Sequence, residues 1–240
     1  MQNAIFHVHT DRCRHMHDDK RENEYIEKTI ELGAKQIWFT DHAPFEGDSI
    51  KDRMFMEQLP EYVDTLNALK EQYADKIDIK IGLEMEYVPT FHDYYVKLRK
   101  TYDFDVYLLG QHFSLLEDGR FSFELEDKSD EARILAKGMI EGMKSGFFDV
   151  VAHPDQIFRR CPEWNEETEA IAQEIKEWAA VTKVILEKNV CNMIGKKKKN
   201  SFRPEFWRDL PEGVETIYGL DAHSVKELEE NYLFLQSYKE

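Results

Sequence analysis

Histidine and carboxylate side chains recur in this 240-residue sequence where short apolar runs end. Six of seven such runs carry a pattern of this kind, beginning with a His-x-His pair and finishing with Asp-x-His. Neutral imidazoles and carboxylates suit zinc, manganese or iron, whereas an all-oxygen set would suit magnesium. The candidate metal ligands are His7, His9, His15, His42, Glu84, His112, His153, Asp221 and His223.

The number of histidines indicates more than one ion. Seven of the nine histidines fall at the ends of these runs or in the loop after the first. Burying so many imidazoles together without metals would be costly. At about four ligands per ion, this set with Glu84 and Asp221 predicts two or three divalent ions, either Zn, Mn or Fe.

Each ligand also has a structural alternative. His7 and His9 would share one face of a strand, but a lone His-x-His pair is a weak signal. Any single histidine could be a hydrogen-bonded core residue, and Asp221 could cap the helix that follows it. Only the joint pattern favours a metal cluster. Glu86 and Asp155 could contact a substrate amine or support a metal-bound histidine.

The runs themselves are rich in β-branched and aromatic residues, which predicts strands. The expected strands span residues 4–8, 36–40, 77–83, 105–109, 149–152, 190–194 and 216–220. Helical spacing lies between them, for example from Leu59 to Tyr73 and from Ile171 to Leu186. Asn165 and Ser129 precede acidic residues and are expected N-caps.

Alternating strands and helices predict an α/β fold with a parallel sheet covered by helices. Both an open doubly wound sheet and a closed barrel fit this alternation. In either fold the carboxyl ends of parallel strands lie on one side, so ligands distant in sequence would converge there.

Composition narrows the function. The net charge of −16 would repel a phosphate backbone, so no nucleic-acid partner is expected. Three cysteines without CxxC spacing fit a reducing compartment. Without a recognisable signal peptide or a span of about 18 apolar residues, we expect a soluble cytoplasmic protein with no membrane partner. The length suits a single domain over residues 1–240.

Acidic residues outnumber basic ones by 48 to 32 in this chain. In so acidic a chain, the basic residues following the fifth and sixth expected strands are candidates to bind a dianionic phosphate. The alternative is that they form a solvated loop. The candidates are Arg159, Arg160, Lys197, Lys198 and Arg203.

As an ordered set, the nine ligands resemble those of the PHP (polymerase and histidinol phosphatase) family, from the first strand to the last. The resemblance implies a distorted (β/α)7 TIM-like barrel with a trinuclear site at the strand ends. It implies a first metal on His7, His9, Glu84 and Asp221, a second on Glu84, His112 and His153, and a third on His15, His42 and His223. Glu84 would bridge two of these ions.

The closer likeness is to stand-alone histidinol-phosphate phosphatases. It rests on Arg12-Cys13-Arg14-His15, Phe39-Thr40-Asp41-His42-Ala43-Pro44, Gly82-Leu83-Glu84 and Leu220-Asp221-Ala222-His223. Gly110-Gln111-His112 and Asn192-Met193-Ile194-Gly195 depart from that branch, and these departures bear on the substrate more than on the chemistry.

The resemblance implies an enzyme that hydrolyses a small-molecule phosphate monoester. The expected reaction converts L-histidinol phosphate to L-histidinol and phosphate, in histidine biosynthesis, by attack of a metal-bridging hydroxide. Glu84 would be the bridge, while Asp221 and His223 would orient the water or protonate the leaving group. The alternatives are a PHP-type phosphodiesterase or nuclease and a non-catalytic metal-binding regulatory protein.

Overall fold

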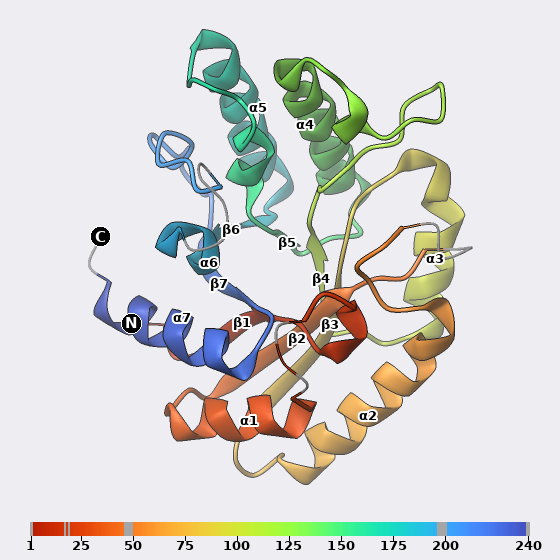
Figure 1. Cartoon of the computed structure of the whole chain (residues 1–240), viewed down its shortest axis with the longest axis vertical. Helices are drawn as coiled ribbons and strands as arrows, with labels where there is room; N and C mark the ends of the chain where they lie inside the picture. Colours follow the sequence, from red (N-terminus) through yellow and green to blue (C-terminus); the bar gives the residue numbers. More distant parts are fainter. Residues whose placement is uncertain (1, 17, 19, 46–49, 196–200, 239–240) are drawn as a thin grey trace. The chain divides into compact units, whose positions relative to one another are not determined.

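In the computed structural model the strands form a closed barrel, which is one of the two predicted alternatives (Figure 1). The model describes residues 2–16, 18, 20–45, 50–195 and 201–238. Over these residues the strands follow one another in chain order around a closed barrel, and the registered pairs are parallel. The strands are β1 (Ile5–Val8), β2 (Gln36–His42), β3 (Asp78–Met85), β4 (Val106–Leu109), β5 (Val150–Val151), β6 (Ile185–Asn189) and β7 (Thr216–Ala222).

Helices alternate with these strands, as expected for an α/β barrel. The α-helices are α1 (Glu22–Glu31), α2 (Leu59–Gln72), α3 (His92–Thr101), α4 (Lys128–Ser145), α5 (Glu166–Thr182), α6 (Val190–Ile194) and α7 (Val225–Ser237). Short 3-10 helices are η1 (Asp11–Cys13), η3 (Met56–Gln58), η4 (Pro89–Phe91), η5 (Ser122–Glu124) and η6 (Pro154–Phe158). None of the helices in the described ranges is both long enough and apolar enough to cross a membrane.

The chain divides into two compact units. The first comprises Met1–Glu84, Tyr102–Val106 and Tyr218–Glu240, and the second comprises Met85–Thr101 and Tyr107–Ile217. The prediction of a single domain over residues 1–240 stays a prediction.

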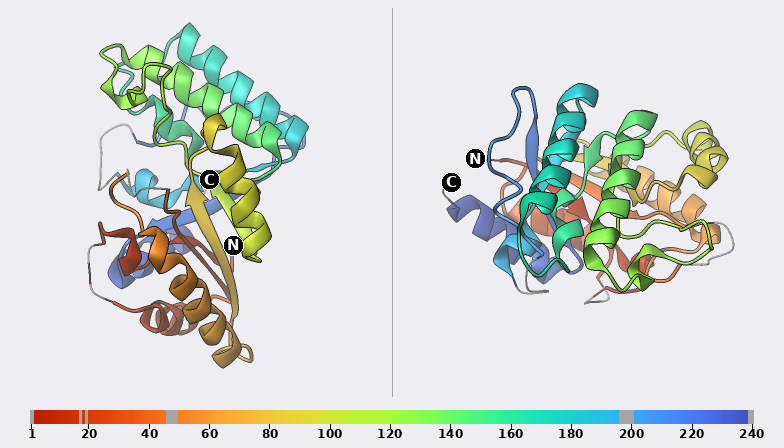
Figure 2. Two further views of the ribbon diagram at one scale, coloured as in Figure 1. Left: turned by 90° about the vertical axis from the view of Figure 1, so that its right-hand side faces the viewer. Right: turned by 90° about the horizontal axis from the view of Figure 1, so that it is seen from above.

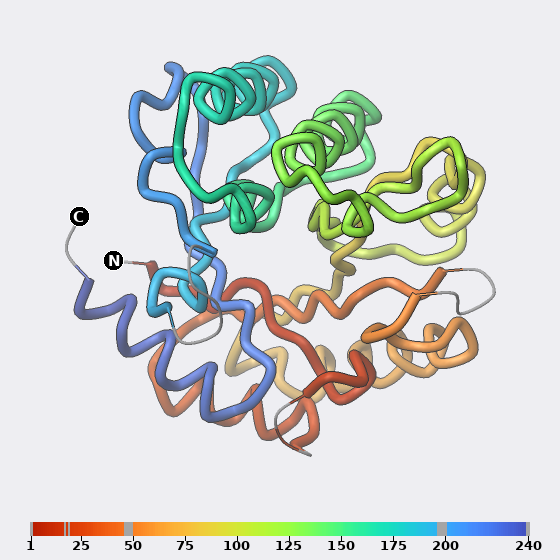
Figure 3. Tube along the Cα trace, turned by 45° about the horizontal axis from the view of Figure 1, so that its top comes forward, coloured from red at the N-terminus to blue at the C-terminus, as the bar shows by residue number. Residues whose placement is uncertain are grey.

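The first unit joins the two ends of the chain. β1 pairs with β2 on one side and with β7 on the other, and α1 and α7 lie side by side (Figures 1 and 3). β3 approaches the start of β4 closely at Gly82, where an added Cβ would meet the Val106 carbonyl oxygen at 2.3 Å. Only glycine fits there without a backbone shift.

The second unit packs α4 against α5 (Figure 2). The Asn165 side chain caps α5 as predicted, accepting a hydrogen bond from the Thr168 N–H at 3.0 Å. The predicted cap Ser129 is wrong. Asp127 caps α4 instead, because its carboxylate accepts from the N–H groups of Ser129 and Asp130.

The sixth predicted strand, residues 190–194, is also wrong. These residues form α6, which Asn189 caps, and the strand is the preceding Ile185–Asn189. Charged Glu187 and Lys188 interrupt the apolar run of β6, although Glu187 is fully buried and accepts a hydrogen bond from the Asn189 amide. The helical spacing from Ile171 to Leu186 also extends past the observed end of α5. The helix ends at Thr182, because the next residue, Lys183, has a left-handed backbone (φ 60°).

Candidate metal centre

Two β-bulges place predicted ligands in the first unit. Phe6 and His7 of β1 lie opposite one residue of β2, and Leu220 and Asp221 of β7 lie opposite His7. His7 (φ 64°) and Asp221 (φ 48°) adopt left-handed backbone conformations. Such strain costs about 1–3 kcal/mol and clusters at functional sites. A bulge, not the regular pleat, therefore brings the rings of His7 and His9 together, with centroids 4.9 Å apart.

Glu84, at the end of β3, lies among three imidazoles of this unit. Its Oε2 atom is 3.1 Å from His7 Nε2, 3.5 Å from His9 Nε2 and 3.2 Å from His42 Nδ1. The Glu84 side chain is buried. Two atoms that each lie about 2.1 Å from a tetrahedral ion are separated by about 3.4 Å. The spacing around this oxygen therefore suits ligands that share ions.

Further ligand atoms gather on the same side of the first unit. His9, His42 and His223 each offer a nitrogen within 4.8 Å of the others, and His7, His9 and Glu84 form a second such group. Asp221 Oδ1 is 3.4 Å from His9 Nε2. The ring of His15 lies nearby and is tilted against both neighbours, with its centroid 4.5 Å from that of His223 and 5.3 Å from that of His42.

Backbone carbonyls set the orientation of two of these rings. His15 Nδ1 lies 2.5 Å from the Cys13 carbonyl oxygen, and His223 Nδ1 lies 3.0 Å from the Asp221 carbonyl oxygen. A carbonyl can only accept, so each Nδ1 donates and each Nε2 presents a lone pair. That is the form of histidine that binds a metal ion.

The charge states also suit metal binding. Burial lowers the pKa of His15, which favours the neutral ring. Burial alone would raise the pKa of Asp221, but the neighbouring histidines hold it well below its ordinary value. Neutral imidazoles and an ionised carboxylate are the forms that ligate a metal.

The second unit holds the other two predicted ligands, His112 and His153. Their ring centroids are 5.0 Å apart, and His153 has a left-handed backbone (φ 34°) at the start of η6. His112 Nδ1 lies 2.9 Å from Glu86 Oε1, and Glu86 is fully buried. This contact favours the supporting role for Glu86 over a contact with a substrate amine.

Asp155 has a local structural role in the second unit. It is fully buried, and its Oδ2 atom accepts a hydrogen bond from the Arg203 backbone N–H at 2.7 Å. Burial raises its pKa to about 7.

Comparison with known proteins decides the family. The model of the PHP domain matches residues 6–190, which is most of the chain. The chain belongs to the PHP domain family. This confirms the resemblance that the ordered ligand set indicated.

Curated relatives of this PHP domain are histidinol phosphatases by name. The chain is 30% identical over 157 residues to a Deinococcus radiodurans protein named "Probable histidinol-phosphatase", and 28% identical over 156 residues to the histidinol-phosphatase of Bacillus subtilis. Each match covers 62% of this chain, and it spans 59% and 58% of the respective relatives. The matched part is thus about three-fifths of the length of each relative.

Solved structures share the fold of this PHP domain. A crystal structure of a candidate histidinol phosphatase from Listeria monocytogenes has a TM-score of 0.82 at 18% identity, covering 98% of this chain and all of the other. The Lactococcus lactis histidinol phosphate phosphatase, complexed with zinc, L-histidinol and phosphate, has a TM-score of 0.72 at 20% identity, covering 98% and 92%. Both confirm the predicted barrel.

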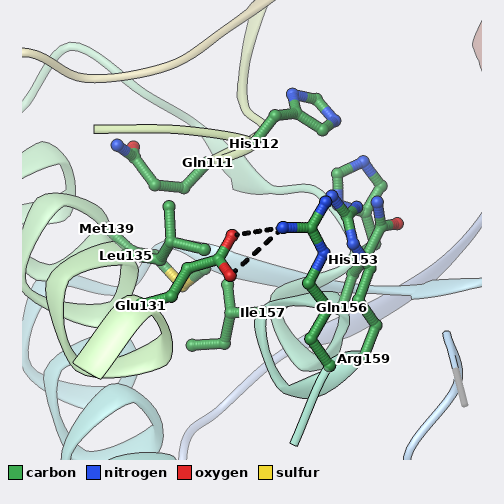
Figure 4. A pocket seen from close by; sticks show the side chains of 10 residues that line it. Gln111, His112, Glu131, Leu135, Met139, His153, Gln156, Ile157 and Arg159 are labelled. Atoms are coloured by element: carbon green, nitrogen blue, oxygen red, sulfur yellow. Dashed lines mark hydrogen bonds and ion pairs between the residues drawn. The ribbon is translucent and has the colours of Figure 1, made fainter. Parts of the chain in front are cut away.

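A pocket in the second unit of the PHP domain brings basic residues beside its histidines (Figure 4). Arg159 and Arg160 line it together with Glu131, His112 and His153. Arg160 Nη1 lies 3.3 Å from both carboxylate oxygens of Glu131. Arg159 is half-buried, and its pKa is lowered by burial and by the charge of Arg160. Because Glu131 already offsets the charge of Arg160, an anion in this pocket would chiefly meet Arg159.

The other predicted phosphate ligands are placed differently. Arg203 is nearly buried, and its guanidinium donates to the carbonyl oxygens of Phe158 (2.9 Å) and Cys161. These contacts bind it to the loop after β5. Lys197 and Lys198 lie outside the described residues.

Sequence spacing alone did not assign a role to three residues around the PHP site. Cys13 and Asp41 belong to the motifs that indicated the family, yet only the fold shows that both lie behind His9. Glu131 is one of several acids at the start of α4, and only the ion pair with Arg160 distinguishes it.

Proposed function

We propose that this PHP domain is a divalent-metal-dependent phosphatase that hydrolyses a small-molecule phosphate monoester. The expected substrate is L-histidinol phosphate, which would place the enzyme in histidine biosynthesis. One observation carries the proposal: a single oxygen of buried Glu84 faces three imidazole nitrogens at 3.1 to 3.5 Å. The names of the curated relatives support the choice of substrate.

The donor set fits two or three ions of Zn, Mn or Fe. In the first unit His7, His9, Glu84 and Asp221 would hold one ion, and His15, His42 and His223 another. In the second unit His112 and His153 would hold a further ion. Divalent ions so held lower the pKa of water and neutralise charge on phosphoryl oxygens.

The protein's own groups would position the reactants. Asp221 keeps 16% of its side chain exposed, so its carboxylate can accept a hydrogen bond from water. The Nδ1 atom of His223 is held by the Asp221 carbonyl, so Nε2 is the nitrogen that can ligate an ion. Neither can act freely as a general acid while it binds an ion, so we assign them to ligation and to orientation of the water.

Phosphate binding is assigned to the pocket of the second unit. A dianionic phosphate would meet the half-buried cation of Arg159 directly. It would compete with Glu131 for Arg160, whose side chain is 42% exposed. The contacts of Arg203 give that residue a structural role in the same loop.

The test is a substrate screen with chelator-stripped protein reloaded with Mn, Zn or Fe. The substrates are histidinol phosphate, other amino-alcohol and sugar phosphates, and an oligonucleotide. We expect phosphate release from histidinol phosphate and little cleavage of the oligonucleotide, given the net charge of −16. Cleavage of the oligonucleotide alone would favour a nuclease, and metal binding without turnover would favour a regulatory protein.

A further inference from the structure

A buried hydrogen-bond network lies directly behind the His9 ring in the first unit. Thr10, Cys13 and Asp41 are all fully buried. Asp41 Oδ1 accepts from the Thr10 N–H at 2.8 Å, from the Thr10 hydroxyl at 3.1 Å and from the Cys13 thiol at 3.0 Å. Cys13 Sγ also accepts from the His42 N–H at 3.1 Å and lies 3.4 Å from His9 Nδ1.

The donors and acceptors in this network can be assigned. The Cys13 thiol is the donor in its 3.0 Å contact with Asp41 Oδ1, because a carboxylate oxygen accepts. That proton points to Asp41, which leaves sulfur lone pairs for the other neighbours of Cys13. The contact between Cys13 Sγ and His9 Nδ1 therefore needs the imidazole to donate. His9 carries its proton on Nδ1.

The opposite nitrogen of His9 faces two carboxylates. His9 Nε2 is 3.5 Å from Glu84 Oε2 and 3.4 Å from Asp221 Oδ1. A lone pair aimed at two anionic oxygens across this distance is repulsive unless a cation lies between them. The tautomer set by Cys13 is thus the one that a metal ion at this point requires.

We infer that Cys13 and Asp41 are positioning residues, forming a relay that holds His9 as the Nδ1–H tautomer with Nε2 aimed at the metal centre. The inference rests on the proposed function, because it assumes that His9 binds a metal ion. Unlike the carboxylate behind His112, this relay places a neutral thiol against the ring. It orients His9 without adding a charge next to it.

A competing interpretation makes Cys13 itself a ligand. His9, Cys13 and Asp41 also place one candidate ligand atom each within 4.8 Å of one another. A thiolate ligand would need Cys13 to lose the proton that it donates to Asp41, against the direction in which burial shifts its pKa. Spectroscopy of the cobalt-loaded protein separates the two interpretations, because a thiolate ligand gives an intense sulfur-to-cobalt charge-transfer band.

The test measures zinc affinity in the stripped full-length protein by competition with a chelator. Cys13→Ala should weaken zinc binding about 10- to 100-fold, as is typical when the partner of a metal-bound histidine is removed. Cys13→Ser keeps a donor for Asp41 and an acceptor for His9, so its affinity should stay near that of the wild type. Cys191→Ala, at a buried cysteine of the second unit, is the matched control.

Nitrogen NMR of the zinc-loaded wild type and of Cys13→Ser adds a second measurement, should Cys13→Ala fail to fold. We expect a proton on His9 Nδ1 and zinc on Nε2 in both. Zinc on Nδ1, a charge-transfer band with cobalt, or unchanged affinity in Cys13→Ala would overturn the relay. If the wild type itself binds no divalent ion, the proposed function fails, and the two failures are thereby distinguished.

Discussion

The two units support their histidines in different ways. In the first unit, the Nδ1 atoms of His9, His15 and His223 meet neutral acceptors, namely a thiol sulfur and two backbone carbonyls, whereas Nδ1 of His42 faces the Glu84 carboxylate. In the second, Nδ1 of His112 meets the carboxylate of Glu86. A carboxylate makes the ring a stronger ligand, whereas a neutral acceptor mainly fixes its orientation. The difference follows the local supply of negative charge, because Glu84 and Asp221 already lie among the histidines of the first unit.

The largest effect is expected at the shared carboxylate of the first unit. Glu84→Gln keeps the size of the side chain but removes the charge that faces three imidazoles. We expect kcat/KM for histidinol phosphate to fall on the order of a thousandfold, or about 4 kcal/mol of transition-state stabilisation. Metal analysis should show the loss of bound ions. Glu61→Gln, at a mostly exposed carboxylate of the same unit, is the control, and full activity in Glu84→Gln would contradict the bridging role.

A smaller effect is expected at the carboxylate of the second unit. Glu86→Gln leaves an acceptor for His112 but removes the charge, so metal affinity should fall about tenfold. Metal titration of the stripped protein measures this change. If the affinity is unchanged while KM for histidinol phosphate rises, Glu86 contacts the substrate amine and the contrast between the units is lost.

The arginines in the pocket of the second unit should contribute to phosphate binding. Arg160→Ala should raise KM for histidinol phosphate about tenfold, since it removes a charge-assisted contact and leaves metal content unchanged. Arg133→Ala, an exposed arginine that also pairs with carboxylates, is the matched control in initial-rate kinetics. An unchanged KM in Arg160→Ala, with a raised KM in Arg159→Ala, would assign the phosphate to Arg159.

The smallest effect concerns the stability of the fold and not metal binding or the reaction. Asn165→Ala removes the side-chain acceptor at the start of α5 and should lower the free energy of unfolding by about 1 kcal/mol. Urea denaturation measures this loss, and metal affinity should not change. A change in metal affinity would mean that mild destabilisation of the second unit perturbs its ligands. The affinity change measured for Glu86→Gln would then have to be corrected for this effect of stability.

The alternation of strands and helices predicts an α/β fold, and the family resemblance of the ligand set implies the barrel. Recurrence of the pattern at six run ends indicates the family, even though single histidines are ambiguous. The prediction is wrong at β6. Buried Glu187 interrupts the apolar run of that strand, and the apolar residues of Val190–Ile194 form a helix and not a strand. Residue identity alone does not indicate that Glu187 is buried.

The site is predictable in composition but not in geometry. The ligand types can be recognised from residue identity, whereas the left-handed backbone of His7 and Asp221 arises from bulges in strand pairing. The partners behind the rings, Cys13 and Glu86, depend on which nitrogen of each histidine faces inward. Both features are set by three-dimensional packing.

Metal titration of the chelator-stripped wild type, followed by phosphate release from histidinol phosphate, tests the central proposal most directly. We predict no turnover without metal, and activity that rises with added Zn, Mn or Fe until two or three ions are bound per chain. Full turnover in the metal-free protein, or saturation with metal and no phosphate release, would contradict the proposal.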